Sequence, residues 1–533
     1  MNLPALKPGR AAILGGAGFK APAPPKTIVL AAAAVLVIVL APFAVTILNA
    51  VHGSLETTLR LLFRPITGHL LLNTLGLAFA STTVCALIGT GAAWLVERTD
   101  LPGRRFWAIA APLPLAIPAF IASYAWLSTS TIFEGAAGAL LVVSASYYPL
   151  VYLPVAAALR NVDPALEESA RTMGCSPWHC FFRVTLPQIK PALLGGMLLV
   201  ILHVLTEFGA FALLRFRTFT TAIYAEYTAG FAADQGALLA CVLLVLCLLI
   251  LVGESFLRGR RDYARIGSGT RRAAARYPLG SARYPTLLVM LALGTVTLGV
   301  PLGLIAYWLT QHDVAAVATA GVSPGLLLGA TWHSLGYGFA AGIATTLVAL
   351  PIAWLSVRYR HPLVHLMERA SFLPRGMPGI VLALALVTLS LTLLRPLYQT
   401  AVLLVAGYAI IFIPLAVVSL RATLAQVQPD LEQSARALGH RPIAVLRRVI
   451  LPLAAPGIGA AMALVFIAVV TELTTTLLLI PTGAQTLATQ VWAASSTFAF
   501  AAAAPYAAIL VVVSMLATWI LANRFGRAPI DME

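Results

Sequence analysis

The chain has 533 residues, of which 60% are hydrophobic and only 10% are charged, and its mean hydropathy is +0.91. Soluble domains carry about 25% charged residues, so this chain cannot cover itself with a charged surface, and a string of soluble domains is excluded. The balance is basic, with 35 Lys and Arg against 19 Asp and Glu. Because the arginines lie in short runs between apolar segments, they indicate cytoplasmic loops of a membrane protein and not a nucleic-acid-binding surface.

The first 26 residues carry four basic side chains before any long apolar run, namely Lys7, Arg10, Lys20 and Lys26. This stretch is longer than the basic region of a signal peptide, and the apolar run that follows is longer than a signal-peptide core. We therefore expect residues 1–26 to form a cytoplasmic N-terminal tail before a retained membrane helix.

A membrane-spanning helix needs about 20 predominantly apolar residues. Twelve segments meet this requirement, and they predict an all-α integral membrane protein. The expected spans are 27–50, 70–96, 106–128, 138–159, 192–214, 237–257, 285–309, 326–357, 370–394, 400–420, 457–480 and 505–523.

Arginine placement predicts the orientation of these spans. With the tail inside, the inside loops hold most of the arginines, whereas the outside stretch 479–505 has no charged residue. The positive-inside rule then places both termini in the cytoplasm. The inside arginines are Arg98, Arg104, Arg105, Arg258, Arg260, Arg261, Arg265, Arg271, Arg272, Arg276, Arg283, Arg358, Arg360, Arg369, Arg524 and Arg527.

The two halves of the chain match at an offset of about 260 residues. Ala93-Trp94-Leu95 recurs as Ala353-Trp354-Leu355, and Leu113-Pro114 with Pro118 recurs as Leu373-Pro374 with Pro378. Six spans per half is an even number, so the halves are parallel repeats related by an axis along the membrane normal. We assign the first repeat to 27–257 and the second to 285–533. The Arg-rich stretch 258–284 between them is expected to be a flexible cytoplasmic linker attracted to anionic membrane lipid.

One repeated segment matches more closely than the rest, at an offset of 265. The first copy runs from Asp163-Pro164 through Gly174 to Leu186-Pro187, and the second from Gln428-Pro429 through Gly439 to Leu451-Pro452. Each proline suits a first helical turn and each glycine suits a helix C-terminus with positive φ. The pattern predicts a short helix, a turn and a second short helix before the next span.

This segment resembles the EAA loop of the binding-protein-dependent ABC importer permeases, whose pattern is a Glu-Ala-Ala stretch, a glycine and a terminal Leu-Pro. The Glu-Ala-Ala positions read Glu168-Ser169-Ala170, with Glu167 before them, and Gln433-Ser434-Ala435, with Glu432 before them. Serine replaces one alanine, and the second copy has glutamine, so the sequence leaves open which acid matters. The resemblance implies a type I ABC importer (MetI-like) permease fold in which 167–174 and 432–439 are coupling helices that dock on ATPase subunits. A surface-bound amphipathic segment is the alternative.

The sequence contains no Gly-x-x-x-x-Gly-Lys-Ser/Thr phosphate-binding run. We therefore expect no enzymatic activity and no cofactor in this chain, with ATP and Mg²⁺ bound by two partner ATPase subunits. The resemblance further implies an extracytoplasmic solute-binding protein as a partner, no nucleic acid, and a location in the bacterial cytoplasmic membrane.

Two stretches outside the coupling segments resemble ferric-iron permeases. The first holds Thr206-Glu207-Phe208-Gly209-Ala210, and the second holds Thr471-Glu472-Leu473-Thr474-Thr475. The resemblance implies ferric iron as cargo. Thiamine and aminoethylphosphonate permeases share the fused layout, so these cargoes remain alternatives.

Glu207 and Glu472 occupy matching places in the fifth and eleventh expected spans, with His203 one turn before Glu207. An acid inside a span costs a few kcal/mol and usually faces protein or water, and carboxylate oxygen suits a hard cation such as ferric ion. These three residues are candidates for the translocation pathway. A glutamate hydrogen-bonded to a neighbouring helix is the structural alternative, and no metal site is assigned.

Two other protein classes share some of these features. A major-facilitator secondary transporter also has two parallel six-helix halves, but it has no reason to repeat the Glu–Gly–Leu-Pro segment. A membrane-embedded enzyme would need clustered His, Asp or Cys, whereas the histidines are scattered. The expected mechanism is alternating access, in which motion of the ATPases moves both coupling helices and rocks the two repeats.

Overall fold

The computed structural model describes residues 24–52, 59–60, 62–162, 164–228, 233–258, 276–311, 323–359, 361–440 and 442–525. The predicted tail, except for its last three residues, and most of the predicted linker lie outside these ranges. Within them, every regular element is helical, and one isolated β-bridge joins Thr99 to Tyr277. The all-α prediction is confirmed.

Ten helical segments are long and apolar enough to cross a membrane. Where a π-helical or 3₁₀ turn interrupts a segment, the flanking helices continue it. The ten are α1 (Lys26–His52), α3 (Pro65–Arg98), α6–α7 (Ala136–Tyr147 and Pro149–Asn161), η3–α10 (Phe181–Thr185 and Leu186–Thr206), α13 (Ala233–Arg258), η4–α14–η5–α15 (Gly280–Ala282, Arg283–Gly294, Thr295–Gly299 and Val300–Thr310), α17 (Pro324–Arg358), α20 (Ala401–Gln426), η8–α23 (Leu446–Ile450 and Leu451–Val470) and α26 (Phe500–Phe525).

The third and ninth expected spans are broken and not straight. In the first repeat, α4 (Arg104–Ala110) and η1 (Leu113–Ala116) meet α5 (Ala119–Leu127) at 88°; in the second, α18 (Pro362–Ser371) and η6 (Leu373–Gly376) meet α19 (Gly379–Thr392) at 104°. The bend lies before Pro118 and Pro378, where Ile117 and Met377 are extended. A residue before proline is pushed out of the α region by the ring, and proline itself lacks an N–H. Twelve spans result when each bent pair counts as one.

The remaining short elements connect these spans, and most occur in matching pairs. The pairs are α8 (Pro164–Thr172) with α21 (Pro429–Ala437), α9 (Pro177–Cys180) with α22 (Pro442–Val445), α11 (Gly209–Leu213) with α24 (Thr474–Leu479), and α12 (Phe219–Thr228) with α25 (Leu487–Ser496); η2 (Thr131–Phe133) and η7 (Arg395–Leu397) complete the set. The repeat seen in the sequence is therefore a repeat of structure, element by element.

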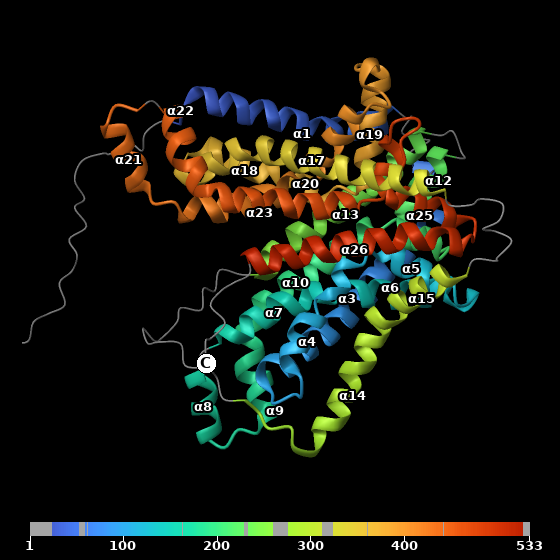
Figure 1. Cartoon of the computed structure of the whole chain (residues 1–533), viewed down its shortest axis with the longest axis vertical. Helices are drawn as coiled ribbons and strands as arrows, with labels where there is room; N and C mark the ends of the chain where they lie inside the picture. The colour runs from blue at the N-terminus through green and yellow to red at the C-terminus, as the bar shows by residue number, and fades with distance from the viewer. Residues whose placement is uncertain are drawn as a thin grey trace, which may run out of the picture.

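The first helix of each repeat packs on the other repeat. Helix α1 lies against α17, α18 and α19 of the second repeat, and Figure 1 shows it along the outer edge of that half. In return, α15 packs on α5 of the first repeat and on α26. This exchange ties the two repeats into one body.

Within the first repeat, α3 packs closely on α7 through Gly89. A Cβ built on Gly89 would lie 2.9 Å from the Tyr148 carbonyl oxygen and 2.9 Å from the Val151 Cβ, whereas nothing lies within 4 Å of a Cβ built on Gly91. Small residues let membrane helices approach closely, and this approach replaces the hydrophobic driving force that water would supply.

We expect Gly89→Ala to lower the thermal stability of the detergent-purified protein, because the added methyl must push α7 away; overpacking of this kind costs about 1–3 kcal/mol. Gly91→Ala is the matched control on the same helix, and better helix propensity should leave its melting temperature unchanged or higher. Equal melting temperatures for the two variants would contradict the packing described here.

Candidate functional site

The repeated segment folds as the sequence predicts. Helices α8 and α21 each begin at a proline, and Gly174 and Gly439 follow them with φ of +86° and +83°. Only glycine adopts that region without strain, so each helix stops there and the chain turns into α9 or α22. Leu186-Pro187 and Leu451-Pro452 then open α10 and α23. The function of these residues remains a prediction.

Each of these short helices is attached to its repeat by a buried ion pair. Arg98 at the end of α3 donates to Glu167 of α8, and the Arg358 Nε at the end of α17 donates to Glu432 of α21 at 2.5 Å. Glu167 and Glu432 are each only 5% exposed. Thr185 also donates to the Glu167 carboxylate, at 2.5 Å. The two pairs attach α8 and α21 to matching places on their repeats.

The structure separates the two adjacent acids of the first copy. Glu167 points inward to Arg98, whereas Glu168 and Ser169 are exposed. Ala170 and Ala435 are buried at 5% and 7%, which leaves room for the short helix to lie close to its repeat. Ser434 is exposed like Ser169, and the Gln433 side chain lies outside the described residues. Thus Glu167 and Glu432 hold the helices in place.

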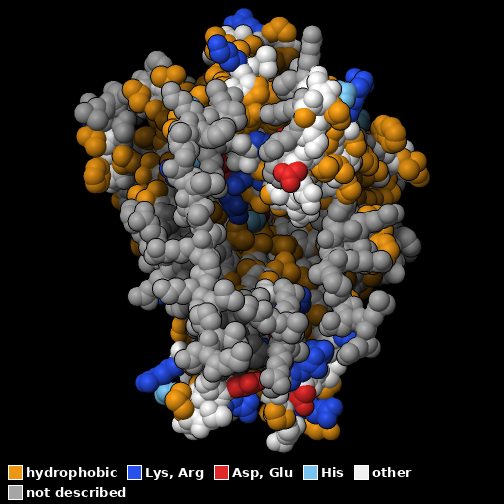
Figure 2. All heavy atoms as spheres, turned by 90° about the vertical axis from the view of Figure 1, so that its left-hand side faces the viewer, with side chains coloured by type: hydrophobic (Ala, Val, Ile, Leu, Met, Phe, Trp, Pro, Cys, Tyr) orange, Lys and Arg blue, Asp and Glu red, His pale blue; other side chains and the backbone are white. Residues whose placement is uncertain are grey.

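The outer faces of α8 and α21 expose large apolar side chains in matching positions. Leu166 and Leu431 are 42% and 43% exposed, and Met173 and Leu438 are 78% and 80% exposed. Both helices lie at the same end of the molecule, at the left of Figure 1. Figure 2 looks at that end and shows hydrophobic side chains in the hollow between its upper and lower parts.

Tyr277, which precedes α14, packs on α8 of the first repeat. Its ring stacks on Trp94 with centroids 5.9 Å apart, and the Arg171 guanidinium lies 5.2 Å from its centroid. Its backbone N–H donates to the Arg98 carbonyl at 2.8 Å. Burial, followed by the Glu167 charge, raises the pKa of Tyr277 to about 12, so the phenol keeps its proton and donates to Glu167 at 3.4 Å.

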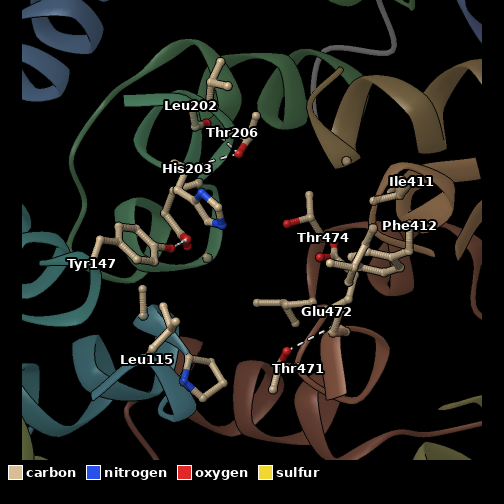
Figure 3. Close-up of a pocket in the computed structure, with 18 of the residues that line it drawn as sticks. Leu115, Tyr147, Leu202, His203, Thr206, Ile411, Phe412, Thr471, Glu472 and Thr474 are labelled. Carbon is tan, nitrogen blue, oxygen red and sulfur yellow. Dashed lines mark hydrogen bonds between the residues drawn. The ribbon is translucent and has the colours of Figure 1, made fainter. Parts of the chain in front are cut away.

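A cavity of about 480 Å³ lies between the two repeats, where the broken spans and the ends of α10 and α23 meet. Figure 3 shows first-repeat residues, including Tyr147 and His203, on one side and second-repeat residues, including Phe412 and Glu472, on the other. Both pathway glutamates and His203 therefore line one cavity, as the sequence suggested they could.

The two glutamates do not lie within helices, which corrects the sequence expectation. Helix α10 ends at Thr206 and Glu207 is extended, while α23 ends at Val470, two residues before Glu472. The Glu207 carboxylate accepts from the Tyr147 hydroxyl at 2.5 Å and from the Ala210 N–H at 2.9 Å. Glu472 accepts from the N–H and the hydroxyl of Thr475, at 3.0 and 3.2 Å. Hydropathy could not reveal these breaks, because the apolar composition continues through them.

His203 and Arg375 make the cavity asymmetric. The His203 Nδ1 lies 2.8 Å from the Leu199 carbonyl oxygen; since a carbonyl only accepts, Nδ1 donates there and Nε2 is the nitrogen left for other contacts. The counterpart of His203 is Ala468, and the counterpart of Arg375 is Leu115; all four line the cavity. Arg375 is exposed, and sequence reasoning did not single it out.

Among the described residues, no three His, Cys, Asp or Glu side chains gather in a way that could hold a metal ion. Sequence reasoning also missed the partners of Arg98 and Arg358, which it read only as orienting charges. The signal was present, because Arg98 and Arg358 match across the repeats and so do Glu167 and Glu432.

We expect Glu167→Gln to loosen α8, because it leaves Arg98 buried without its counter-charge, and breaking a buried pair in this way costs about 3–5 kcal/mol. Hydrogen–deuterium exchange of the α8 amides should become faster in this variant and stay unchanged in Glu168→Gln, its exposed neighbour. Equal exchange in both variants would show that the ion pair does not hold the helix.

The chain matches known transport proteins over most of its length. Residues 27–256 and 321–526 match the model of the family described as binding-protein-dependent transport system inner membrane component. The Fe(3+)-transport system permease protein FbpB 2 of Haemophilus influenzae is 37% identical over 484 residues, which cover 90% of this chain and 94% of that protein. The molybdenum transport system permease protein ModB of H. influenzae is 28% identical over 200 residues (33% of this chain, 86% of that protein), and the sulfate transport system permease protein CysW of Synechocystis is 27% identical over 251 residues (43% and 90%). The chain is therefore a fused, two-repeat member of the family of binding-protein-dependent transport system inner membrane components, the permease subunits of ABC importers.

Proposed function

We propose that this permease subunit carries ferric iron across the bacterial cytoplasmic membrane, with ATP hydrolysed by partner subunits. The observation that carries the proposal is the central cavity, which is framed by the same helix break in both repeats and has a carboxylate at each break. The full-length similarity to a Fe(3+)-transport permease favours iron over the other cargoes. The family membership excludes the major-facilitator alternative, whereas thiamine or an aminoethylphosphonate-like solute would use the same architecture.

The proposed partners follow from the two ends of the molecule. Two ATPase subunits, which hold ATP and Mg²⁺, bind the exposed apolar faces of α8 and α21, one subunit to each helix. That end faces the cytoplasm, as do both chain termini, because the positive-inside rule places the arginine-rich loops there. A solute-binding protein delivers cargo at the opposite end. This arrangement is supported by the matched exposure of Met173 and Leu438.

The contacts of α8 suggest how ATPase motion reaches the cavity. Glu167 accepts a hydrogen bond from Thr185, the residue directly before α10, and Glu207 directly follows α10 at its far end. A 21-residue helix is about 30 Å long, so a displacement of α8 is carried to the cavity by one rigid element. In the second repeat, α23 connects the α21 region to Glu472 in the same way. Rigid-body rocking of the repeats then opens the cavity alternately to each side.

Met173→Asp combined with Leu438→Asp should abolish co-purification of the ATPase subunits, because each change puts a charge into an apolar docking face. Both positions are exposed, so the melting temperature of the isolated permease should not change. Thr310→Asp, at an exposed position at the other end of the molecule, is the control and should bind ATPase normally. ATPase binding by the double variant would refute the docking assignment.

Glu207→Gln and Glu472→Gln should each lower ATP-dependent uptake of radioactive ferric iron by at least about tenfold in liposomes containing the whole complex, if the carboxylates contact cargo. The change removes charge and preserves the fold. In Glu207→Gln the side-chain oxygen still accepts from Ala210 while the new amide donates to the Tyr147 oxygen, and in Glu472→Gln the side-chain oxygen still accepts from Thr475. Normal uptake by the double variant, with normal complex assembly, would leave the glutamates a purely structural role.

A further inference from the structure

The central cavity holds charges of both signs. Its described lining includes two carboxylates, Glu207 and Glu472, the imidazole of His203 and the guanidinium of Arg375. With His203 neutral, the lining carries one net negative charge. A bare ferric ion brings three positive charges, so it would leave a net excess of two positive charges away from bulk water. Uncompensated buried charge is strongly unfavourable, and Arg375 is the lining residue that adds to that excess.

The carboxylates are also poorly arranged to coordinate a bare ion alone. Glu207 accepts from Tyr147 and Ala210, and Glu472 accepts twice from Thr475. Each caps the short helix that follows it, so its orientation is fixed by its own repeat. Among the described residues, no third carboxylate, cysteine or histidine joins them to form a ligand cluster. A ferric ion here therefore needs ligands that it brings with it.

The cavity volume points the same way. At about 480 Å³, it equals roughly sixteen times the volume that one water molecule occupies in the liquid, and it falls within the range of sites for small organic ligands. It is much larger than a metal ion needs. A complex of ferric ion with a small multidentate anion would fill more of this space and would neutralise most of the ionic charge.

Arg375 is placed to recognise such an anion. It lies at the break of the second repeat, between η6 and α19, and within electrostatic range of His203. A guanidinium offers planar paired donors that match carboxylate and phosphate oxygens. The matching position of the first repeat is Leu115, which offers none. The anion-binding part of the cavity is therefore confined to one side.

We propose, on the basis of the proposed iron transport, that iron crosses this cavity as a complex with an oxyanion ligand, and that Arg375 binds that ligand. The class of ligand is a small carboxylate or phosphate that coordinates ferric ion. Arg375 is then a cargo-specificity residue, and the two glutamates face the iron-bearing side of the complex. No bond is made or broken in the protein by this step.

The test uses the complete complex, with its ATPase and solute-binding subunits, in liposomes. Ferric iron labelled with ⁵⁵Fe is supplied with excess ¹⁴C-citrate in one arm and with excess ³²P-phosphate in another, and both labels are counted inside. We compare wild type with Arg375→Gln, Arg375→Lys and the control Arg369→Gln, an exposed arginine outside the cavity lining. Stimulation of ATP hydrolysis by the binding protein shows that each variant is assembled.

We expect one of the anions to enter with iron in a fixed ratio in wild type and in Arg369→Gln. Arg375→Gln should lower uptake of both labels by roughly tenfold or more, the scale of one charge-assisted hydrogen bond, and Arg375→Lys should restore part of it. Iron entry with neither anion, or full uptake by Arg375→Gln, would overturn the inference.

A separate arm with ³⁵S-sulfate and ⁹⁹Mo-molybdate distinguishes failure of the iron assignment from failure of the anion site. If wild type takes up no iron but takes up one of these oxyanions, and Arg375→Gln abolishes that uptake, the iron cargo is wrong and the anion site stands, with the oxyanion itself as the cargo. If no oxyanion enters in an Arg375-dependent way, with or without iron, the anion site is refuted.

Discussion

Two buried arginine–glutamate pairs set the position of everything that this protein presents to its partners. Helices α8 and α21 have nine residues each, and helices of that length are not stable alone in water. Their places are therefore set by attachment, through Arg98–Glu167 and Arg358–Glu432. Ion pairs of this kind gain little over an apolar contact, but they are costly to break and they fix geometry. Each pair also joins the short helix to the end of a long one, so the two move together.

The backbone of the molecule is symmetric where its cavity is not. Both repeats bend at a proline, both end a long helix just before a glutamate, and both cap the next short helix with that glutamate. Yet His203 faces Ala468 and Arg375 faces Leu115 across the pseudo-symmetry. Symmetric framing allows the repeats to rock about a shared axis, while the asymmetric lining gives a small cargo only one favourable way to lie.

Much of this architecture could be predicted from the sequence, because hydropathy, charge and the internal repeat are local signals. The spans, the parallel repeats and the turn at Gly174 and Gly439 follow from composition and residue type alone. The breaks at Glu207 and Glu472 could not be predicted in that way, since the apolar run continues past them into α11 and α24. The prolines at 118 and 378 were visible, but membrane helices tolerate proline, so their presence does not by itself predict a right-angled bend.

The ion pairs escaped prediction for a different reason. Their partners lie 69 and 74 residues apart in the chain, and a loop arginine has an adequate explanation as an orienting charge. Only the match between repeats hinted at more. The same holds for Arg375, which sits in a proline-rich turn that composition marks as a connection and that three-dimensional packing turns toward the cavity.

The exchange of first helices between repeats has a consequence for how the protein is made. Helix α1 is synthesised before residue 53, but the helices of the second repeat on which it packs, α17 to α19, begin only at Pro324. At ribosomal rates of about 5–20 residues per second, α1 waits on the order of tens of seconds in the bilayer before these packing partners emerge. During that interval it is held by lipid and, once residues 233–258 are made, by its main first-repeat contact, α13. Neither repeat can complete its fold until nearly the whole chain has left the ribosome, so assembly of this transporter is a late, concerted event of biosynthesis.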